Sequence, residues 1–139
     1  MNDLIRRVAV RQAIVPIHAT TGHATTATEV NATGYSRALW VVDVGAMDAA
    51  AVIEMKVQHA TATGGTFSDM TSAALTNVTS AGASKLCLID HAVNPSYPFL
   101  KLKGTCGTAR ALIGAVVILY GKNGLVRDPQ TNTGQVVDL

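Results

Sequence analysis

Residues 38–59 read ALWVVDVGAMDAAAVIEMKVQH, and this stretch decides the fold. Its second half alternates apolar and polar side chains, and a period of two places the two kinds on opposite faces of a β-strand. Its first half, residues 39–44, is almost continuously apolar and β-branched, which is typical of a strand covered on both faces. The pattern predicts two strands joined by a short turn. The alternating residues are Ile53, Met55 and Val57 on one face and Glu54, Lys56 and Gln58 on the other.

A helix over residues 48–59 is the alternative interpretation. Asp48 is a suitable N-cap residue, and the apolar residues that surround it also fit one stripe of a helix. We favour the strand because the polar residues alternate cleanly and no helix stop signal follows His59. The stripe of the helical interpretation consists of Ala46, Ala49, Ala50, Ile53 and Val57.

The rest of the central region also predicts short strands separated by turns. Residues 86–89 suit a short buried strand, and residues 99–105 and 109–120 are further strand candidates. Two prolines within residues 94–98 exclude both a helix and a central strand there. Residues 104–107, GTCG, are expected to form a hairpin loop. No long helical period occurs, so the expected fold is all-β, an antiparallel β-sandwich with a jelly-roll-like core.

The expected domain organisation is a core at residues 35–121 with an extended arm on either side, residues 1–34 and 122–139. In the N-terminal arm, Pro16 is expected to break any regular element, and residues 18–28 lack a hydrophobic period. A chain of 139 residues forms a single domain that buries about two-thirds of its unfolded surface.

Three groups of residues are candidates for contact with another subunit. The first arm is locally basic, either as a solvated face or as an interaction segment. Two lysines of the core share one strand face. Spaced valines in the second arm suit an extended strand that is added to a neighbour's sheet, with simple disorder as the equal alternative. The candidate contact residues are Arg6, Arg7, Arg11, Lys101, Lys103, Val126, Val136 and Val137.

Composition limits the classes of partner. A net charge of +2 gives the chain no nucleic-acid footprint, so no direct contact with nucleic acid is expected. The charged fraction of 14% is low and mean hydropathy is +0.28, which favours apolar area that is hidden in an assembly. The longest apolar run, residues 111–120, is too short for a spanning helix, and the aromatic girdles of a membrane barrel are missing. No membrane partner is expected.

Catalytic and metal-binding patterns are weak. His18 and His23 have no metal-ligand spacing, and His59 is in phase with the core face of its strand. Asp90 and His91 are adjacent, so an extended chain points them to opposite faces. No nucleophile, zinc or phosphate-binding motif is present in the sequence. We therefore expect no enzyme activity, catalytic residue, metal or cofactor.

The two cysteines point to a reducing compartment. Cys87 and Cys106 lie outside any CxxC or Cys/His metal spacing. They are predicted to be two free thiols, with a disulfide between them left open as the alternative. This usage agrees with an intracellular origin of the protein.

Residues 35–57, followed by GGTFSDMTSAAL at residues 64–75, resemble a pattern in the small head decoration (cement) proteins of tailed bacteriophages. In that family a Gly-Tyr segment and a valine-rich strand precede an alternating strand, a Gly-rich turn and a Phe-Ser-Asp segment. Residues 98–121 resemble the paired closing strands of the same family. The likeness covers residues 33–121. The chain lacks the family's acidic Ser-Asp-Asp-Gly turn and has ATATGG at residues 60–65 instead.

The resemblance implies a virion structural protein that binds the exterior of the capsid and bridges major capsid subunits. It implies assembly in the cytoplasm of the bacterial host. The expected partners are the major capsid protein and further copies of the chain, as a homodimer or homotrimer. Two alternatives stay open, a phage tail or head–tail connector component and a carbohydrate-binding β-sandwich module. The second needs exposed aromatic side chains for sugar stacking, and Trp40 lies in the strand expected to be most buried.

Overall fold

The computed structural model describes residues 8–20, 23–25, 27–80 and 83–121, and every named element within these ranges is a β-strand. The prediction of an all-β fold is therefore confirmed. The strands are β1 (Ala9–Ala19), β2 (His23–Thr25), β3 (Val30–Asn31), β4 (Arg37–Met47), β5 (Val52–Ala60), β6 (Ser68–Val78), β7 (Lys85–Ala92), β8 (Phe99–Gly107) and β9 (Ala111–Tyr120).

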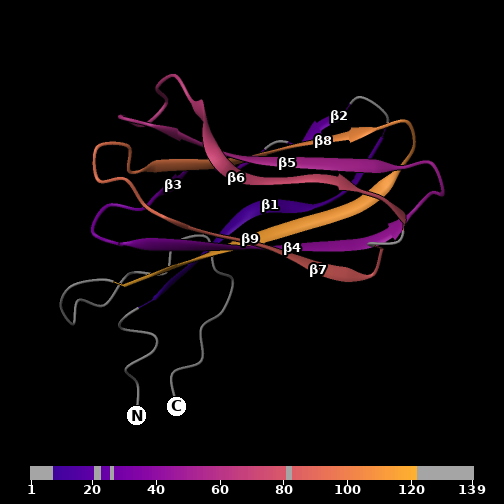
Figure 1. Cartoon of the computed structure of the whole chain (residues 1–139), viewed down its shortest axis with the longest axis horizontal. Coiled ribbons are helices and arrows are strands. Elements are labelled where there is room, and N and C mark those ends of the chain that lie inside the picture. The colour runs from indigo at the N-terminus through magenta and orange to yellow at the C-terminus, as the bar shows by residue number, and fades with distance from the viewer. Residues whose placement is uncertain (1–7, 21–22, 26, 81–82, 122–139) are drawn as a thin grey trace, which may run out of the picture.

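The strands form two antiparallel sheets that pack face to face (Figure 1). Sheet A has the order β1-β9-β4-β7, and sheet B has the order β2-β8-β5-β6, with the short β3 also paired to β8. The chain passes repeatedly from one sheet to the other, and these two four-strand orders together are those of a jelly roll. The expected β-sandwich with a jelly-roll-like core is confirmed.

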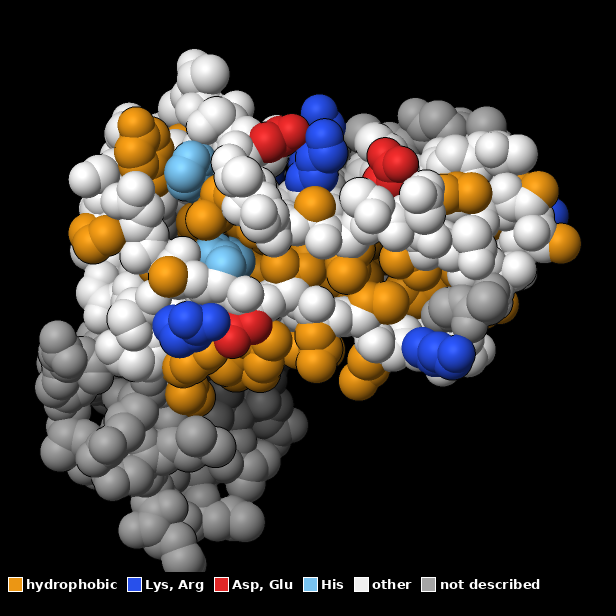
Figure 2. Space-filling model, viewed as in Figure 1, with side chains coloured by type: hydrophobic (Ala, Val, Ile, Leu, Met, Phe, Trp, Pro, Cys, Tyr) orange, Lys and Arg blue, Asp and Glu red, His pale blue; other side chains and the backbone are white. Residues whose placement is uncertain are grey.

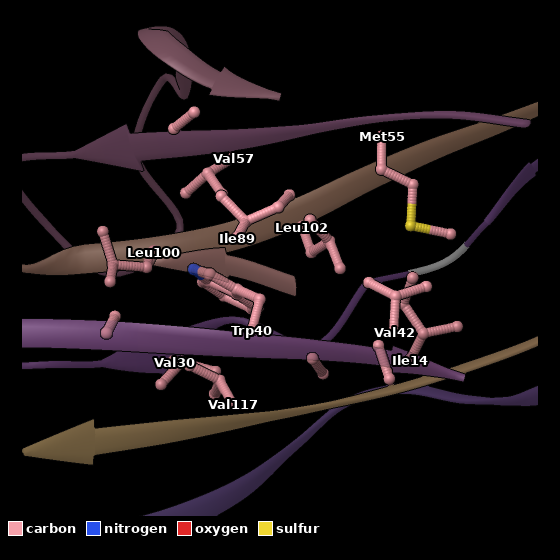
Figure 3. Packing of buried hydrophobic residues seen from close by; sticks show 14 of the residues in the cluster. Ile14, Val30, Trp40, Val42, Met55, Val57, Ile89, Leu100, Leu102 and Val117 are labelled. Atoms are coloured by element: carbon pink, nitrogen blue, oxygen red, sulfur yellow. The ribbon is translucent and has the colours of Figure 1, made fainter. Parts of the chain in front are cut away.

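The core lies between the sheets and follows the period-two rule of strands. In β4, Ala38, Trp40, Val42 and Val44 are buried, while the residues between them face the other way. Figure 3 shows Trp40 in the middle of the cluster, among buried side chains from both sheets. The largest fully buried side chains are Trp40, Ile14, Ile53, Met55, Leu100, Leu102, Leu119, Val42, Val44, Val57, Val117 and Cys106.

Strand β5 confirms the alternation in the sequence, because its apolar residues point into the core and Glu54 and Lys56 point outward. The helical alternative for residues 48–59 is wrong. The expected hairpin loop at residues 104–107 is also wrong, since these residues complete β8 and pair with β5. Gly104 lies opposite Met55. The chain turns later, between β8 and β9.

The N-terminal segment is part of the sandwich, which corrects the expected boundary between arm and core. Strand β1 pairs with β9 from Ala9, opposite Leu119, to Ala19, opposite Ala111, and β2 and β3 pair with β8. Pro16 does not end β1, because β1 is an edge strand and its register shifts between Ile14 and Ile17. Of the two predicted arms, residues 1–7 and 122–139 lie outside the described residues.

Candidate functional site

The two outer faces of the sandwich differ in chemistry. The outer face of sheet A, here called the apolar face, carries large hydrophobic side chains from all four of its strands. In Figure 2 such side chains (orange) line the lower rim of the molecule, where sheet A lies, and charged side chains are visible both along the upper rim and just above this lower rim. The exposed large side chains of the apolar face are Leu86 (63% exposed), Leu88 (57%), Val15 (57%), Leu112 (44%) and Val116 (38%).

Strand register builds the apolar face from segments that are distant in the sequence. Val41 on β4 lies between Leu88 on β7 and Val116 on β9. These side chains share one face because directly paired residues in a sheet point the same way. Residues 39–44 were expected to be covered on both faces and residues 86–89 to form a short buried strand. The structure corrects both expectations, because the side chains on the face turned away from sheet B stay partly or largely exposed.

A groove of about 620 Å³ runs along the apolar face beside the register shifts of β1 against β9, between Gln12 and Ile17. Pro16 and His18 border it on one side and Leu86 on the other. Gly114 forms part of its floor, and a Cβ atom there would lie 3.3 Å from Pro16 Cγ. The missing side chain therefore allows β1 to lie close over the sheet at this point.

Asp43 is the one carboxylate among the residues that line this groove. It is exposed on β4, between Leu86 on β7 and Gly114 on β9. Its side chain makes no hydrogen bond or ion pair with another described residue. The groove thus combines apolar walls with a single negative charge.

The outer face of sheet B, here called the charged face, has the opposite character. Lys56 and Lys103 are direct cross-strand neighbours, a repulsive arrangement that Asp69 offsets by an ion pair to Lys56 at 3.2 Å. Two hydrogen bonds hold the pKa of Asp69 below its usual value, the larger effect coming from Gln58 and the smaller one from Lys56. Lys101 lies over the ring of Phe67, 4.6 Å from its centroid.

The three candidate contact residues that the structure describes, Arg11, Lys101 and Lys103, do not form one site. Lys101 and Lys103 share a face as predicted, but it is the charged face and not the apolar one. Arg11 is 9% exposed within β1 and donates to the carbonyl of Val10, so it does not lie on a free arm. The other candidates, Arg6, Arg7, Val126, Val136 and Val137, lie outside the described residues.

Sequence reasoning missed the apolar face itself. Its signal was present: residues 39–44, 86–89 and 111–120 are apolar on both strand faces, although a two-layer sandwich covers only one. Composition indicated apolar area hidden in an assembly, but the sequence did not place it on the second face of these strands. The structure shows that the second face of these strands stays uncovered by the described residues.

Asp90 and His91 lie on opposite faces of β7, as predicted. Asp90 accepts hydrogen bonds from Arg37 and from the Tyr120 hydroxyl, each at 2.8 Å. Arg37 also donates to Tyr120, and these contacts lower the pKa of Asp90 and raise that of Arg37. The three side chains tie β7, β4 and β9 together at one end of sheet A.

His91 points inward and contacts the single tryptophan. Trp40 Nε1 donates to His91 Nε2 at 2.9 Å, and His91 Nδ1 lies 2.9 Å from the carbonyl of Ala92. Partial burial lowers the pKa of His91 because it disfavours the charged ring. Trp40 is fully buried, which confirms that it offers no surface for sugar stacking.

The remaining polar groups form no recognisable reaction centre among the described residues. His59 stacks on Tyr97 with ring centroids 4.6 Å apart, at the rim of the core, as expected from its phase in β5. Cys87 and Cys106 are free thiols, and burial raises the pKa of Cys106. Within the described ranges, no group of three or more His, Cys, Asp or Glu side chains is arranged to hold a metal ion. The same residues contain no helix of the length and apolarity that a membrane span requires.

Comparison with known proteins shows a likeness in structure without one in sequence. No protein-family model and no curated protein matches the chain. The PBSX exported protein XepA is similar over 100% of this chain and 45% of its own, with a TM-score of 0.56 and 10% identity. A structure of infectious bursal disease virus, Gx strain, is similar over 87% of this chain and 33% of its own, with a TM-score of 0.51 and 12% identity. The chain thus spans less than half of either neighbour and shares their fold.

Proposed function

We propose that this chain is a structural protein of a bacteriophage virion, a decoration (cement) protein that binds the outside of the capsid and bridges major capsid subunits. The observation that carries the proposal is the apolar face. Contiguous exposed hydrophobic surface of this kind marks a site of protein association. The sequence resemblance to decoration proteins and the fold shared with a phage protein and a virus structure support the same role.

The size of the apolar face suits a specific interface. Four strands about 4.8 Å apart and about 33 Å long present roughly 600 Å² of flat surface, before side-chain relief is counted. Each partner in a standard protein interface buries about 800 Å². One face of sheet A is therefore close to sufficient for stable attachment.

The proposed mechanism is mechanical. A shell that holds packaged DNA is weakest where its subunits meet, and a clamp strengthens it only by binding across that seam. Each contact needs modest affinity, because many symmetric copies act together. The apolar face seats on the shell and the charged face remains in water. The proposal includes no catalytic step, cofactor, nucleic acid or membrane.

Binding to purified, expanded heads tests the proposal. The native chain should co-sediment with heads and raise the temperature at which they release DNA. Leu88→Lys places a charge on the apolar face, in its edge strand β7, at a side chain that is 57% exposed, so the fold should survive and head binding should be lost. Thr105→Lys is the matched control, because it adds the same charge at an exposed strand position on the charged face. Equal binding by both variants would contradict the proposal.

Electron microscopy of decorated virions separates this role from that of a tail or connector component. A decoration protein is distributed over the whole shell. A tail or head–tail connector protein forms rings at a single vertex. Density confined to that vertex would replace the decoration role with the second one.

A further inference from the structure

The groove on the apolar face places restrictions on what covers it. Its walls are mostly apolar, with Gln12 and His18 on the β1 side, and Asp43 projects among them with no ion pair to any described residue, His18 included. An occupant that is apolar throughout would strip water from this carboxylate and leave a charge unpaired, which is strongly unfavourable. The occupant must therefore bring a cation together with apolar side chains.

The described cations of this chain do not meet that requirement. They are fixed within paired strands or next to them, as in the ion pairs of Arg37 with Asp90 and of Arg110 with Asp48. The sequence outside the described ranges holds four more cations, Arg6, Arg7, Lys122 and Arg127.

Only one of these cationic segments matches the groove in chemistry. Leu4 and Ile5 directly precede Arg6 and Arg7, so two apolar and two cationic side chains follow each other. In the segment LVRD at residues 125–128, the acid beside Arg127 cancels its charge, and in GKNG at residues 121–124 Lys122 has no apolar neighbour. We propose that the groove binds residues 4–7 of a second copy of this chain, with an arginine paired to Asp43.

Strand register assigns the segment to a second copy. Strand β1 starts at Ala9, opposite Leu119, and Asp43 lies opposite Gly114, five residues further along β9. The start of β1 is therefore about 17 Å from the level of Asp43 along the strands. The chain enters β1 from the side away from the groove, and Arg7 is two residues before Ala9. Even if the chain turned straight back, the backbone of Arg6 would recover no more than about 10 Å, and the arginine would also have to reach across two strand spacings, about 10 Å, because β9 lies between β1 and β4. An arginine side chain does not span both gaps.

Exchange of this segment links each subunit to its neighbours. This link is additional to the contact that each subunit makes with the shell. Reciprocal exchange between two copies gives a closed dimer, and exchange around a ring gives a trimer or larger cycle. The inference rests on the proposed function for its purpose, a decoration layer with lateral links. Its test needs no capsid, so an experiment can contradict either proposal while the other stands.

Sedimentation equilibrium of the full chain provides the test. The native chain should self-associate, and both Asp43→Lys and the double variant Arg6→Glu/Arg7→Glu should weaken association by about ten-fold or more. Combining all three substitutions restores opposite charges in the groove and should recover most of the lost affinity. Glu54→Lys is the control for Asp43→Lys, because it reverses an exposed acid on the charged face and should leave association unchanged.

Each other outcome overturns the inference. These outcomes are a monomeric native chain at all concentrations, an unaffected Asp43→Lys variant, failure of the charge exchange to restore association, or a loss caused by Arg127→Glu instead. A chain that binds heads but does not self-associate retains the proposed function and loses this inference. A chain that self-associates through the groove but ignores heads retains the inference and loses the decoration role.

Discussion

Acidification from about pH 7 to about pH 5 should destabilise the protein through His91. The ring uses both nitrogens in its neutral form: Nε2 accepts from Trp40, and Nδ1 is placed to donate to the Ala92 carbonyl. A second proton would have to sit on Nε2, against the indole N–H, and break that hydrogen bond. Burial is the main cause of the lowered pKa. The hydrogen bond to the Ala92 carbonyl and the charge of Asp90 oppose it, and Arg37 and His59 add smaller effects of the same sign as burial.

The sign and size of the effect follow from proton linkage. The folded state holds the His91 pKa below the ordinary value of 6.5, so the unfolded chain binds more protons below that pH. The stability that His91 contributes is complete above pH 6.5 and is lost as pH falls toward the folded-state pKa. One proton sets an upper limit of about 1.4 kcal/mol per pH unit, and the partly solvated ring should give a smaller slope. Three carboxyl groups also have lowered pKa values, those of Glu29, Asp69 and Asp90. The stability that they contribute is lost below about pH 4.5, outside this window.

Urea unfolding at a series of pH values, followed by Trp40 fluorescence, measures the slope. His91→Gln keeps an acceptor for the indole N–H but does not titrate, so its free energy of unfolding should be flat between about pH 5 and about pH 7. His18→Gln is the matched control, because His18 is exposed on β1, and it should keep the native slope. A native slope that persists in His91→Gln would refute this reasoning.

Two further predictions concern the fold. Ile89→Ala should lower the free energy of unfolding by about 3 kcal/mol, because the side chain is only 6% exposed. Leu88→Ala, at the preceding residue of β7, should lower it by less than about 1 kcal/mol, because that side chain is 57% exposed. Chemical denaturation measures both losses, and similar values would mean that the faces of β7 are reversed. Gly121→Ala should be more destabilising than Gly64→Ala, although both glycines have a positive φ, because only at Gly121 does the new Cβ overlap a side chain, that of Ser36. Melting temperatures of the two variants measure the difference, and equal losses would show that backbone strain alone matters.

Local pattern was sufficient for several of the strands and for part of the site. Alternation in residues 52–58 identified β5, because side chains repeat every two residues along a strand and every 3.6 along a helix. The same rule placed Asp90 and His91 on opposite faces and His59 at the rim of the core. Burial of Trp40 followed from its place in an unbroken apolar strand.

The sequence by itself determined that this chain forms pleated strands, because the spacing of side chains along a strand is a property of neighbouring residues. Only the tertiary structure decided which sheet each strand joins, that β1 belongs to the sandwich, and that residues 104–107 continue β8. It also decided that one face of β4, β7 and β9 stays open. The physical reason is that strand pairing is a long-range contact, and an apolar side chain has the same chemistry whether its own fold or another molecule covers it.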